Sequence, residues 1–385
     1  MSKMEKMIAQ TFLDMARALE TGEAGKRPVI AVTGMGSEHG EQNAMEGALI
    51  AQAKGVDVVY IGTITNDKVR CVSVPDEDAA HKMMEKLLDS KEVDGAVTMH
   101  YPFPIGVSTV GRVVTPGKGK AMYLATTTGT SSTDRIEGMV KNAIYGIIAA
   151  KTCGVENPTV GIANVDGARQ AETILKKLQE NGYPITFATS ARADGGCVMR
   201  GNDILTGSAD VMVVDSLTGN LMVKMLSAYT SGGSYEALGW GYGPGIGEGY
   251  DRLVMIVSRA SGAAVIGGAL EYGGQMVRGN YRKVADEEFA KANKAGLKDL
   301  LAARKAASAK PAEEKKEVKM PPKEVVTAAI AGVEVMDLED AVQALWAESI
   351  YAESGMGCTG PVILVSEANL AKATECLQKA GYVGE

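Results

Sequence analysis

The chain has 385 residues, of which 45% are hydrophobic and 23% are charged, and its formal net charge at pH 7 is −7. These proportions are typical of a soluble globular protein with one large or two ordinary domains. The acidic balance argues against nonspecific binding to nucleic acid, because such binding depends on clustered Lys and Arg side chains.

Neither a membrane span nor a disulfide framework is predicted. The most apolar long window, Leu253–Leu270, is interrupted by Arg259 and by several glycines and serines. Residues 1–20 carry acidic side chains where a signal peptide needs an apolar core, so we expect an amphipathic helix there. The five cysteines are odd in number and widely spaced, which fits neither paired disulfides nor a zinc site and favours a cytoplasmic protein. The sequence predicts no bound cofactor or metal.

The first junction between a strand and a helix is rich in glycine. Residues Pro28–Thr33 predict a strand, and the turn that follows it, residues 34–40, leads into a helix. The glycines lack the spacing of a dinucleotide-binding motif, so this turn alone indicates no particular nucleotide. His39 is a candidate general base or phosphate donor, and the alternative is that its ring only caps or packs the turn.

The alternation of strands and helices continues and predicts an α/β fold with a mostly parallel sheet and helices on both faces. A rigid loop, His100–Pro104, leaves the predicted strand Gly95–Met99, and a tract of Ser and Thr follows the strand Met122–Thr126. After the strand Val160–Val165, Arg169 lies in a turn, and its guanidinium is suited to bidentate contacts with phosphate.

Two strand ends within residues 209–262 carry the polar side chains of a candidate anion site. The strand Val211–Val214 ends at Asp215, and a Thr-Gly-Asn turn at 218–220 is expected to precede a helix that carries Lys224. After a glycine-rich loop, a second buried strand ends at Ser258-Arg259. Open α/β sheets bind ligands at the carboxyl ends of their strands. The candidate phosphate- or acyl-binding residues are therefore Asp215, Asn220, Lys224, Ser258 and Arg259. The alternative is that each of these residues only caps a turn or faces solvent.

The composition changes after Glu271. Residues Asp286–Ala307 predict one helix rich in Ala and Lys, and Ser308–Glu324 is charged, contains three prolines and has almost no large apolar residue. Because such a segment cannot bury a core, we divide the chain into a body, a charged mobile linker and a small C-terminal α/β unit. The boundaries are 1–300, 301–324 and 325–385. Within the last unit, Val325–Ala331 is predicted to be helical.

Cys358 is the candidate nucleophile of the C-terminal unit. It lies in a glycine turn just before the predicted strand Val362–Val365, where flanking glycines leave its sulfur little shielded. Backbone amides in such a turn can stabilise a thiolate and later an acyl oxyanion. The alternative is a small buried apolar residue, since no histidine adjacent in sequence supports a catalytic dyad.

The body resembles the phosphate acyltransferases of phospholipid synthesis. Residues 35–40 (Met-Gly-Ser-Glu-His-Gly), Gly154–Pro158 and the strand-Asp-Thr-Gly-Asn-Lys pattern of 211–224 carry that resemblance. The strand that ends in Ser258-Arg259 is similar, more distantly, to the phosphate acetyl- and butyryltransferases. The resemblance implies an acyltransferase/isocitrate-dehydrogenase-like body with two lobes, in which Arg169 replaces a lysine of the family.

Two departures from these families bear on function. The loop His100–Pro104 is bulkier than the small turn that the acyltransferases have there, which suggests that the acyl group is accommodated differently. The phosphate acetyltransferases have an acidic residue a few positions after Ser-Arg, whereas Ala260–Ala264 offers none. Since that acid serves as base toward a coenzyme thiol, its absence favours a protein-bound thiol over coenzyme A.

With its charged linker and its Gly-Met-Gly-Cys-Thr-Gly-Pro tail at 355–361, the whole chain resembles the alpha subunits of protein C in glycine/sarcosine/betaine reductase complexes. That resemblance implies that a selenoprotein A partner presents a carboxymethyl group, that an acetyl thioester forms on cysteine, and that phosphate releases acetyl phosphate. It also implies a beta subunit similar to ketoacyl synthases, and we expect an oligomer without nucleic-acid or membrane partners. On this resemblance, Cys358 is the cysteine that carries the acetyl group.

Three other functions are compatible with parts of the pattern. The first is a free-standing phosphate acyltransferase that uses coenzyme A or acyl carrier protein, with Cys358 incidental. The second is a noncatalytic assembly subunit in which the substitutions at His100–Pro104 and Arg169 mark a decayed site. The third, a metal-dependent decarboxylating dehydrogenase, is disfavoured because the sequence lacks spaced aspartates for a metal and an adenosine-binding signature.

Overall fold

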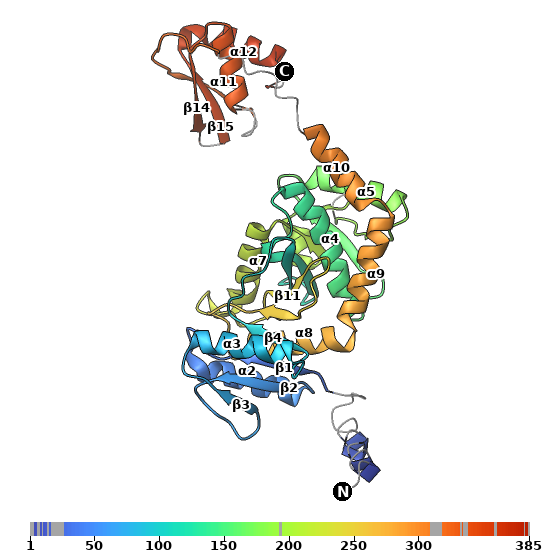
Figure 1. The fold of residues 1–385 in the computed structure, drawn as a ribbon. Helices are drawn as coiled ribbons and strands as arrows, with labels where there is room; N and C mark the ends of the chain where they lie inside the picture. Colours follow the sequence, from blue (N-terminus) through green and yellow to red (C-terminus); the bar gives the residue numbers. More distant parts are fainter. Residues whose placement is uncertain are drawn as a thin grey trace. The chain divides into compact units, whose positions relative to one another are not determined.

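The computed structural model describes residues 27–191, 195–308, 318–331, 338–357 and 360–380, with a few residues outside these ranges (4–5, 8–9, 11–13, 15–16, 333 and 382–383). It divides into two compact units, Met1–Ala303 and Arg304–Glu385, each with its own sheet (Figure 1). Much of the predicted N-terminal helix lies outside the described residues.

The larger unit is built on a sheet of twelve strands in the described residues, with the order β3-β2-β1-β4-β12-β11-β5-β6-β10-β7-β8 and with β9 also paired to β7. One half is parallel and contains β1 (Val29–Thr33), β2 (Asp57–Gly62), β3 (Arg70–Ser73), β4 (Gly95–Thr98) and β12 (Val254–Ile256). The other half is also parallel and contains β6 (Ala121–Thr130), β7 (Thr159–Ala163), β8 (Thr186–Phe187), β9 (Val198–Met199) and β10 (Val211–Val213).

Two antiparallel strands join the halves, β5 (Val107–Val114) and β11 (Gly243–Ile246). Strand β11 has no strand signal in the sequence, because its alternate glycines remove the side chains on which periodicity depends. Those glycines are required by close packing: a Cβ at Gly243 would lie 1.7 Å from the carbonyl oxygen of Val110 on β5. The prediction of a mostly parallel sheet is confirmed, with this antiparallel junction as an addition.

Helices cover both faces of each half of the sheet. The helices of this unit are α2 (Gly40–Ala53), α3 (Glu77–Asp89), α4 (Arg135–Thr152), α5 (Ala168–Glu180), α6 (Gly201–Thr206), α7 (Ser216–Ala228), the 3-10 turn η1 (Tyr229–Ser231), α8 (Ala263–Arg278) and α9 (Tyr281–Lys294). On β1, Ile30 and Val32 share a core cluster with α2 and α8, whereas Ala31 packs with α3. Likewise, α4 and α5 pack on one face of the second half and α7 on the other. Burial of strands on both faces explains their continuous apolar runs.

The predicted single helix at Asp286–Ala307 is two helices. Helix α9 ends at Lys294, and α10 (Leu297–Ser308) begins after Gly296, whose φ of 84° is in the left-handed region that favours glycine. Because α10 continues to Ser308, the first residues of the predicted linker, 301–308, are helical.

The C-terminal unit has an antiparallel sheet of order β13-β15-β14, with β13 (Ala328–Ala331), β14 (Ala352–Gly357) and β15 (Gly360–Val365). Its helices are α11 (Leu338–Ala347), the 3-10 turn η3 (Glu367–Asn369) and α12 (Leu370–Lys379). The predicted helix at Val325–Ala331 is wrong, since β13 pairs along its length with β15. A short run of Val, Ala and Ile has no periodicity that distinguishes a helix from a strand, so the pairing with β15 decides which of the two this segment forms.

Among the described residues, no helix combines the length and apolarity that a bilayer crossing requires. Within those residues there is also no cluster of three or more His, Cys, Asp or Glu side chains arranged to hold a metal ion.

Candidate active site

A cavity of about 440 Å³ lies where the carboxyl ends of β4 and β12 and the loop after β1 meet β6 and α7. Ligands of open α/β sheets bind at such edges. Its lining residues are Glu38, Met99, His100, Thr128, Asn220, Lys224, Tyr242, Ile256, Val257, Ser258, Arg259 and Ala260. The cavity therefore brings together four of the residues predicted from the sequence, which come from both halves of the sheet.

Asp215 is the N-cap of α7, so the predicted Thr-Gly-Asn turn is the first turn of this helix and not a preceding loop. The backbone N–H and the hydroxyl of Thr218 donate to the Asp215 carboxylate at 3.1 and 2.6 Å, and Arg135 donates at 3.1 Å. Burial disfavours the charged carboxylate, but the hydrogen bonds from Thr218 and the charge of Arg135 outweigh it and lower the pKa of Asp215. Asp215 lines a separate cavity of about 280 Å³ beside Arg135.

Gly219 lets the start of α7 lie directly on strand β6. A Cβ at this position would be 1.7 Å from the carbonyl oxygen of Thr126. The next residue, Asn220, donates through Nδ2 to the carbonyl of Thr127 at 3.0 Å. These two contacts fix the rotation of α7 and place Lys224, about one turn further along, on the cavity wall.

Replacing Gly219 by alanine is expected to destabilise the protein by about 3 kcal/mol, because a methyl group must displace backbone and not a flexible side chain. Denaturant unfolding of the full chain measures the change. Gly201→Ala on α6 is the matched control, since a Cβ there has no atom within 4 Å and its effect is expected to stay within about 0.5 kcal/mol. Equal stability of the two variants would contradict the packing described for α7.

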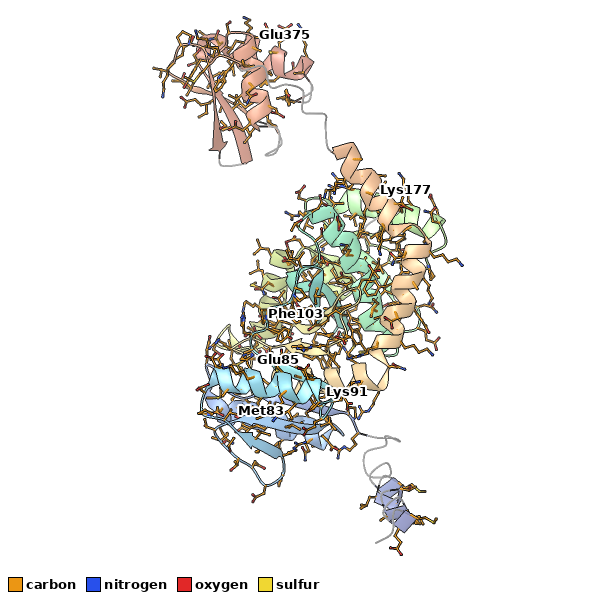
Figure 2. All side chains as sticks on the ribbon, in the orientation of Figure 1. Met83, Glu85, Lys91, Phe103, Lys177 and Glu375 are labelled. Carbon is orange, nitrogen blue, oxygen red and sulfur yellow. The ribbon has the colours of Figure 1, made fainter. Side chains whose placement is uncertain are left out.

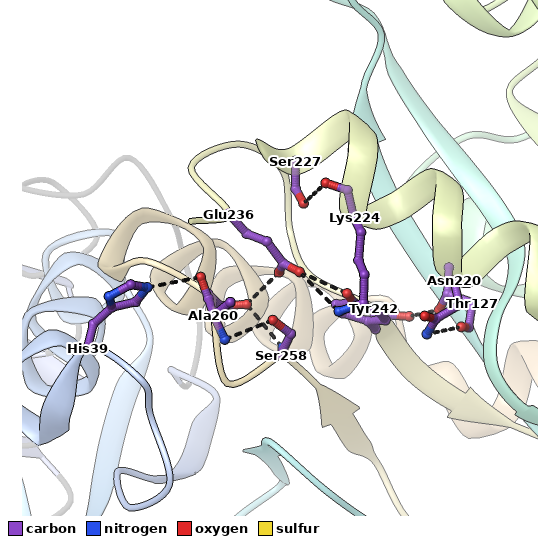
Figure 3. Close-up of polar contacts among 10 residues, drawn as sticks. His39, Thr127, Asn220, Lys224, Ser227, Glu236, Tyr242, Ser258 and Ala260 are labelled. Atoms are coloured by element: carbon purple, nitrogen blue, oxygen red, sulfur yellow. Dashed lines mark hydrogen bonds and ion pairs between the residues drawn. The ribbon is translucent and has the colours of Figure 1, made fainter. Parts of the chain in front are cut away.

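A buried carboxylate, Glu236, lies between Lys224 and the turn that carries Ser258 (Figure 3). Its side chain is 4% exposed and accepts hydrogen bonds from Tyr242 Oη at 2.8 Å and Ser261 Oγ at 2.7 Å. Lys224 Nζ is 3.9 Å from its Oε1 and 5.4 Å from the centre of the Tyr242 ring. Burial and the neighbouring carboxylate raise the pKa of Tyr242, so its hydroxyl stays protonated and donates. Glu236 thereby holds the Lys224 ammonium at the cavity.

The turn after β12 is held in a fixed shape. Ser258 Oγ accepts from the N–H of Ala260 at 3.0 Å, and the N–H of Ser258 donates to Ser261 Oγ at 3.0 Å. The loop after β1 supports this turn, because the Glu38 N–H donates to the Arg259 carbonyl at 2.8 Å and His39 Nε2 is 3.3 Å from the Ala260 carbonyl. His39 therefore contacts the turn from outside and is absent from the residues that line the cavity.

The two predicted arginines differ in position. Arg259 is half exposed, lines the cavity and donates to Glu77 Oε1 at 2.8 Å. Arg169 lies in the first turn of α5, is largely exposed, and pairs with Glu172 at 2.9 Å. Arg169 is not among the residues that line the cavity.

Cys358 and its neighbour Thr359, which stand between β14 and β15 in the sequence, lie outside the described residues. Of the other cysteines, burial raises the pKa of Cys153 to about 11, and burial together with Glu172 raises that of Cys197 to about 11. Burial also raises the pKa of Cys376. Thiols with such pKa values are protonated at neutral pH and are poor nucleophiles.

Sequence reasoning missed Glu236, Tyr242 and His100. Residues 260–264, just after Ser258-Arg259, carry no acidic side chain, whereas Glu236 comes 25 positions before the Ser261 hydroxyl that it binds. The sequence carries one signal for the burial of Glu236, which is its position between Tyr235 and Ala237-Leu238. A carboxylate among apolar neighbours in a loop is a candidate for burial.

The fold and cavity together define an α/β protein with a cationic, hydroxyl-bearing pocket at the carboxyl edge of its sheet. Comparison with known proteins gives the family. Residues 29–364 match the family model described as "Fatty acid synthesis protein". A phosphate acyltransferase from Thermotoga maritima is 26% identical over 51% of this chain and 68% of its own length, and one from Lysinibacillus sphaericus is 25% identical over 54% and 73%.

A glycine/sarcosine/betaine reductase complex component C subunit alpha from Peptoclostridium acidaminophilum is 56% identical over 100% of both chains. The chain therefore belongs to the family of the component C alpha subunits of these reductase complexes. Among solved structures, a branched-chain phosphotransacylase from Enterococcus faecalis is similar with a TM-score of 0.46 and 15% identity, over 65% of this chain and 99% of that one.

Proposed function

We propose that this chain forms acetyl phosphate by attack of inorganic phosphate on an acetyl thioester carried by Cys358, as part of a glycine/sarcosine/betaine reductase complex. The single observation that carries the proposal is the cavity lined by residues of both halves of the sheet. Its wall includes the cations Lys224 and Arg259, the hydroxyl of Ser258 and the amide of Asn220. Relatives named as a reductase component and as phosphate acyltransferases support the same reaction class.

The cavity has the groups that phosphate attack needs. Phosphate is largely a dianion near neutral pH, and the thioester carbonyl develops negative charge as the phosphate oxygen attacks. Lys224 and Arg259 offset both charges, and Ser258 Oγ and Asn220 offer polar contacts at the same wall. In the step itself a carbon–oxygen bond forms, the carbon–sulfur bond of the thioester breaks, and the products are acetyl phosphate and the free thiol.

Of the remaining candidates, Asp215 and His39 act through the backbone that they hold, at the start of α7 and at Ala260 respectively. Arg169 is not among the residues that line this cavity, and the proposal assigns it no role there. The charged segment that precedes β13 acts as a tether for Cys358, with an effective concentration that depends on its length. The partners are a ketoacyl-synthase-like beta subunit and selenoprotein A, which delivers the carboxymethyl group.

A chain that ends at Ser308 separates this function from a free-standing acyltransferase. We expect it to lose the exchange of labelled inorganic phosphate into acetyl phosphate, because the acyl-bearing cysteine is gone. Circular dichroism and thermal unfolding check that the shortened chain retains its body. Full formation of acetyl phosphate from acetyl-coenzyme A by that chain would instead support the free-standing enzyme, with Cys358 incidental.

A further inference from the structure

His100 is a histidine on the wall of the same cavity as Lys224, Ser258 and Arg259. The chain has three histidines in all. His81 lies on α3, outside the residues that line this cavity, and His39 contacts the Ala260 carbonyl behind the turn. His100 is thus the histidine of the described chain that faces the space proposed for phosphate.

The loop that carries His100 is held from several sides. Arg252 donates to Tyr101 Oη at 3.2 Å and is itself paired with Glu85 and with Asp89 of α3. The Phe103 ring packs on Tyr101 and Tyr250 with centroid distances of 5.0 and 6.0 Å. Two prolines, at 102 and 104, restrict the backbone further. These contacts hold the backbone of the loop from which the His100 side chain projects.

We propose that His100 is a catalytic residue that transfers the proton in phosphate attack. The inference rests on the proposed function. Hydrogen phosphate attacks through one oxygen, the carbon–sulfur bond breaks, and the phosphate hydroxyl proton passes through the imidazole to the departing sulfur. Protons and charge then balance: hydrogen phosphate and thioester give the acetyl phosphate dianion and a neutral thiol. Histidine suits this role because it gains and loses a proton near neutral pH.

The other ionisable groups that face the cavity are less suited to it. Lys224 and Arg259 are cations that stabilise charge, and the Tyr242 hydroxyl is committed to Glu236 at 2.8 Å. Glu38 is the competing base, but its carboxylate would be repelled by a phosphate dianion. His100 therefore supplies a proton-transfer group that the sequence lacks in the segment after Ser258-Arg259.

The test measures exchange of labelled inorganic phosphate into acetyl phosphate by the full chain, alone and with the other components of its complex. His100→Gln is expected to lower kcat about 100-fold with little change in KM for phosphate, and to remove the limb of the pH profile that a histidine produces. Added imidazole is expected to restore part of the activity of His100→Ala. The control, His81→Gln, is expected to retain full activity.

Unchanged exchange with His100→Gln would overturn the inference while the proposed function stands. A loss of the same pH limb in Glu38→Gln or His39→Gln, and not in His100→Gln, would move the role to that residue. A wild-type chain that gives no exchange under either condition contradicts the proposed function itself, and this inference with it.

Discussion

Replacing Lys224 by glutamine is expected to lower the rate of acetyl phosphate formation by about 1000-fold, the loss typical of removing a strong charge-stabilising group. Lys224 Nζ lies 3.9 Å from the buried Glu236 carboxylate. Without the ammonium, Lys224 no longer offsets the charge of this buried carboxylate, which then acts on the phosphate dianion in the neighbouring cavity. The variant thus loses an attraction and gains a repulsion, and both act on the transition state. Initial rates over a range of phosphate concentrations measure the effect.

Two variants give this prediction its controls. Lys224→Arg keeps the charge and is expected to lose much less activity, although the guanidinium differs in shape. Lys177→Gln removes an exposed cation from α5, a helix that contributes no residue to the cavity lining (Figure 2). This variant is expected to form acetyl phosphate at the wild-type rate. A Lys224→Gln variant within twofold of the wild type would show that phosphate binds elsewhere.

Replacing Cys358 by serine is expected to reduce phosphate exchange to background, because a serine hydroxyl is not appreciably ionised at neutral pH and a thiolate is the nucleophile. The matched control is Cys376→Ser in the same C-terminal unit. Cys376 packs against the core of that unit, and burial raises its pKa, so its loss is expected to leave exchange intact. Retained exchange in Cys358→Ser would transfer the nucleophile to another residue or to a partner subunit.

The parts of the fold that the sequence predicts are those in which local signals and tertiary packing agree. Buried parallel strands need long apolar runs, as in Val29–Thr33, and Asp134 at the start of α4 caps that predicted helix through its side chain. The candidate anion residues Asn220, Lys224, Ser258 and Arg259 follow from the rule that strand ends share an edge of the sheet, and they line one cavity.

The parts that sequence reasoning missed depend on contacts between distant segments. The hydrogen bond from Ser261 to Glu236, and the bond from Arg252 that fixes the His100 loop, join residues whose proximity no local pattern encodes. The resemblance to a lysine of the family makes Arg169 a candidate, but Arg169 lies in the first turn of α5 and pairs with Glu172. The sequence predicts a helix where β13 forms, because the pairing with β15 decides the conformation of this segment and no local pattern encodes it.

The most direct test of the central claim is to incubate the full chain with labelled acetyl phosphate, digest it, and map the label by mass spectrometry. The account predicts label on Cys358 that is absent in Cys358→Ser and is discharged by added phosphate or arsenate. Label on a different residue of the folded chain, or no label on this chain when the other components of its complex are present, would contradict it.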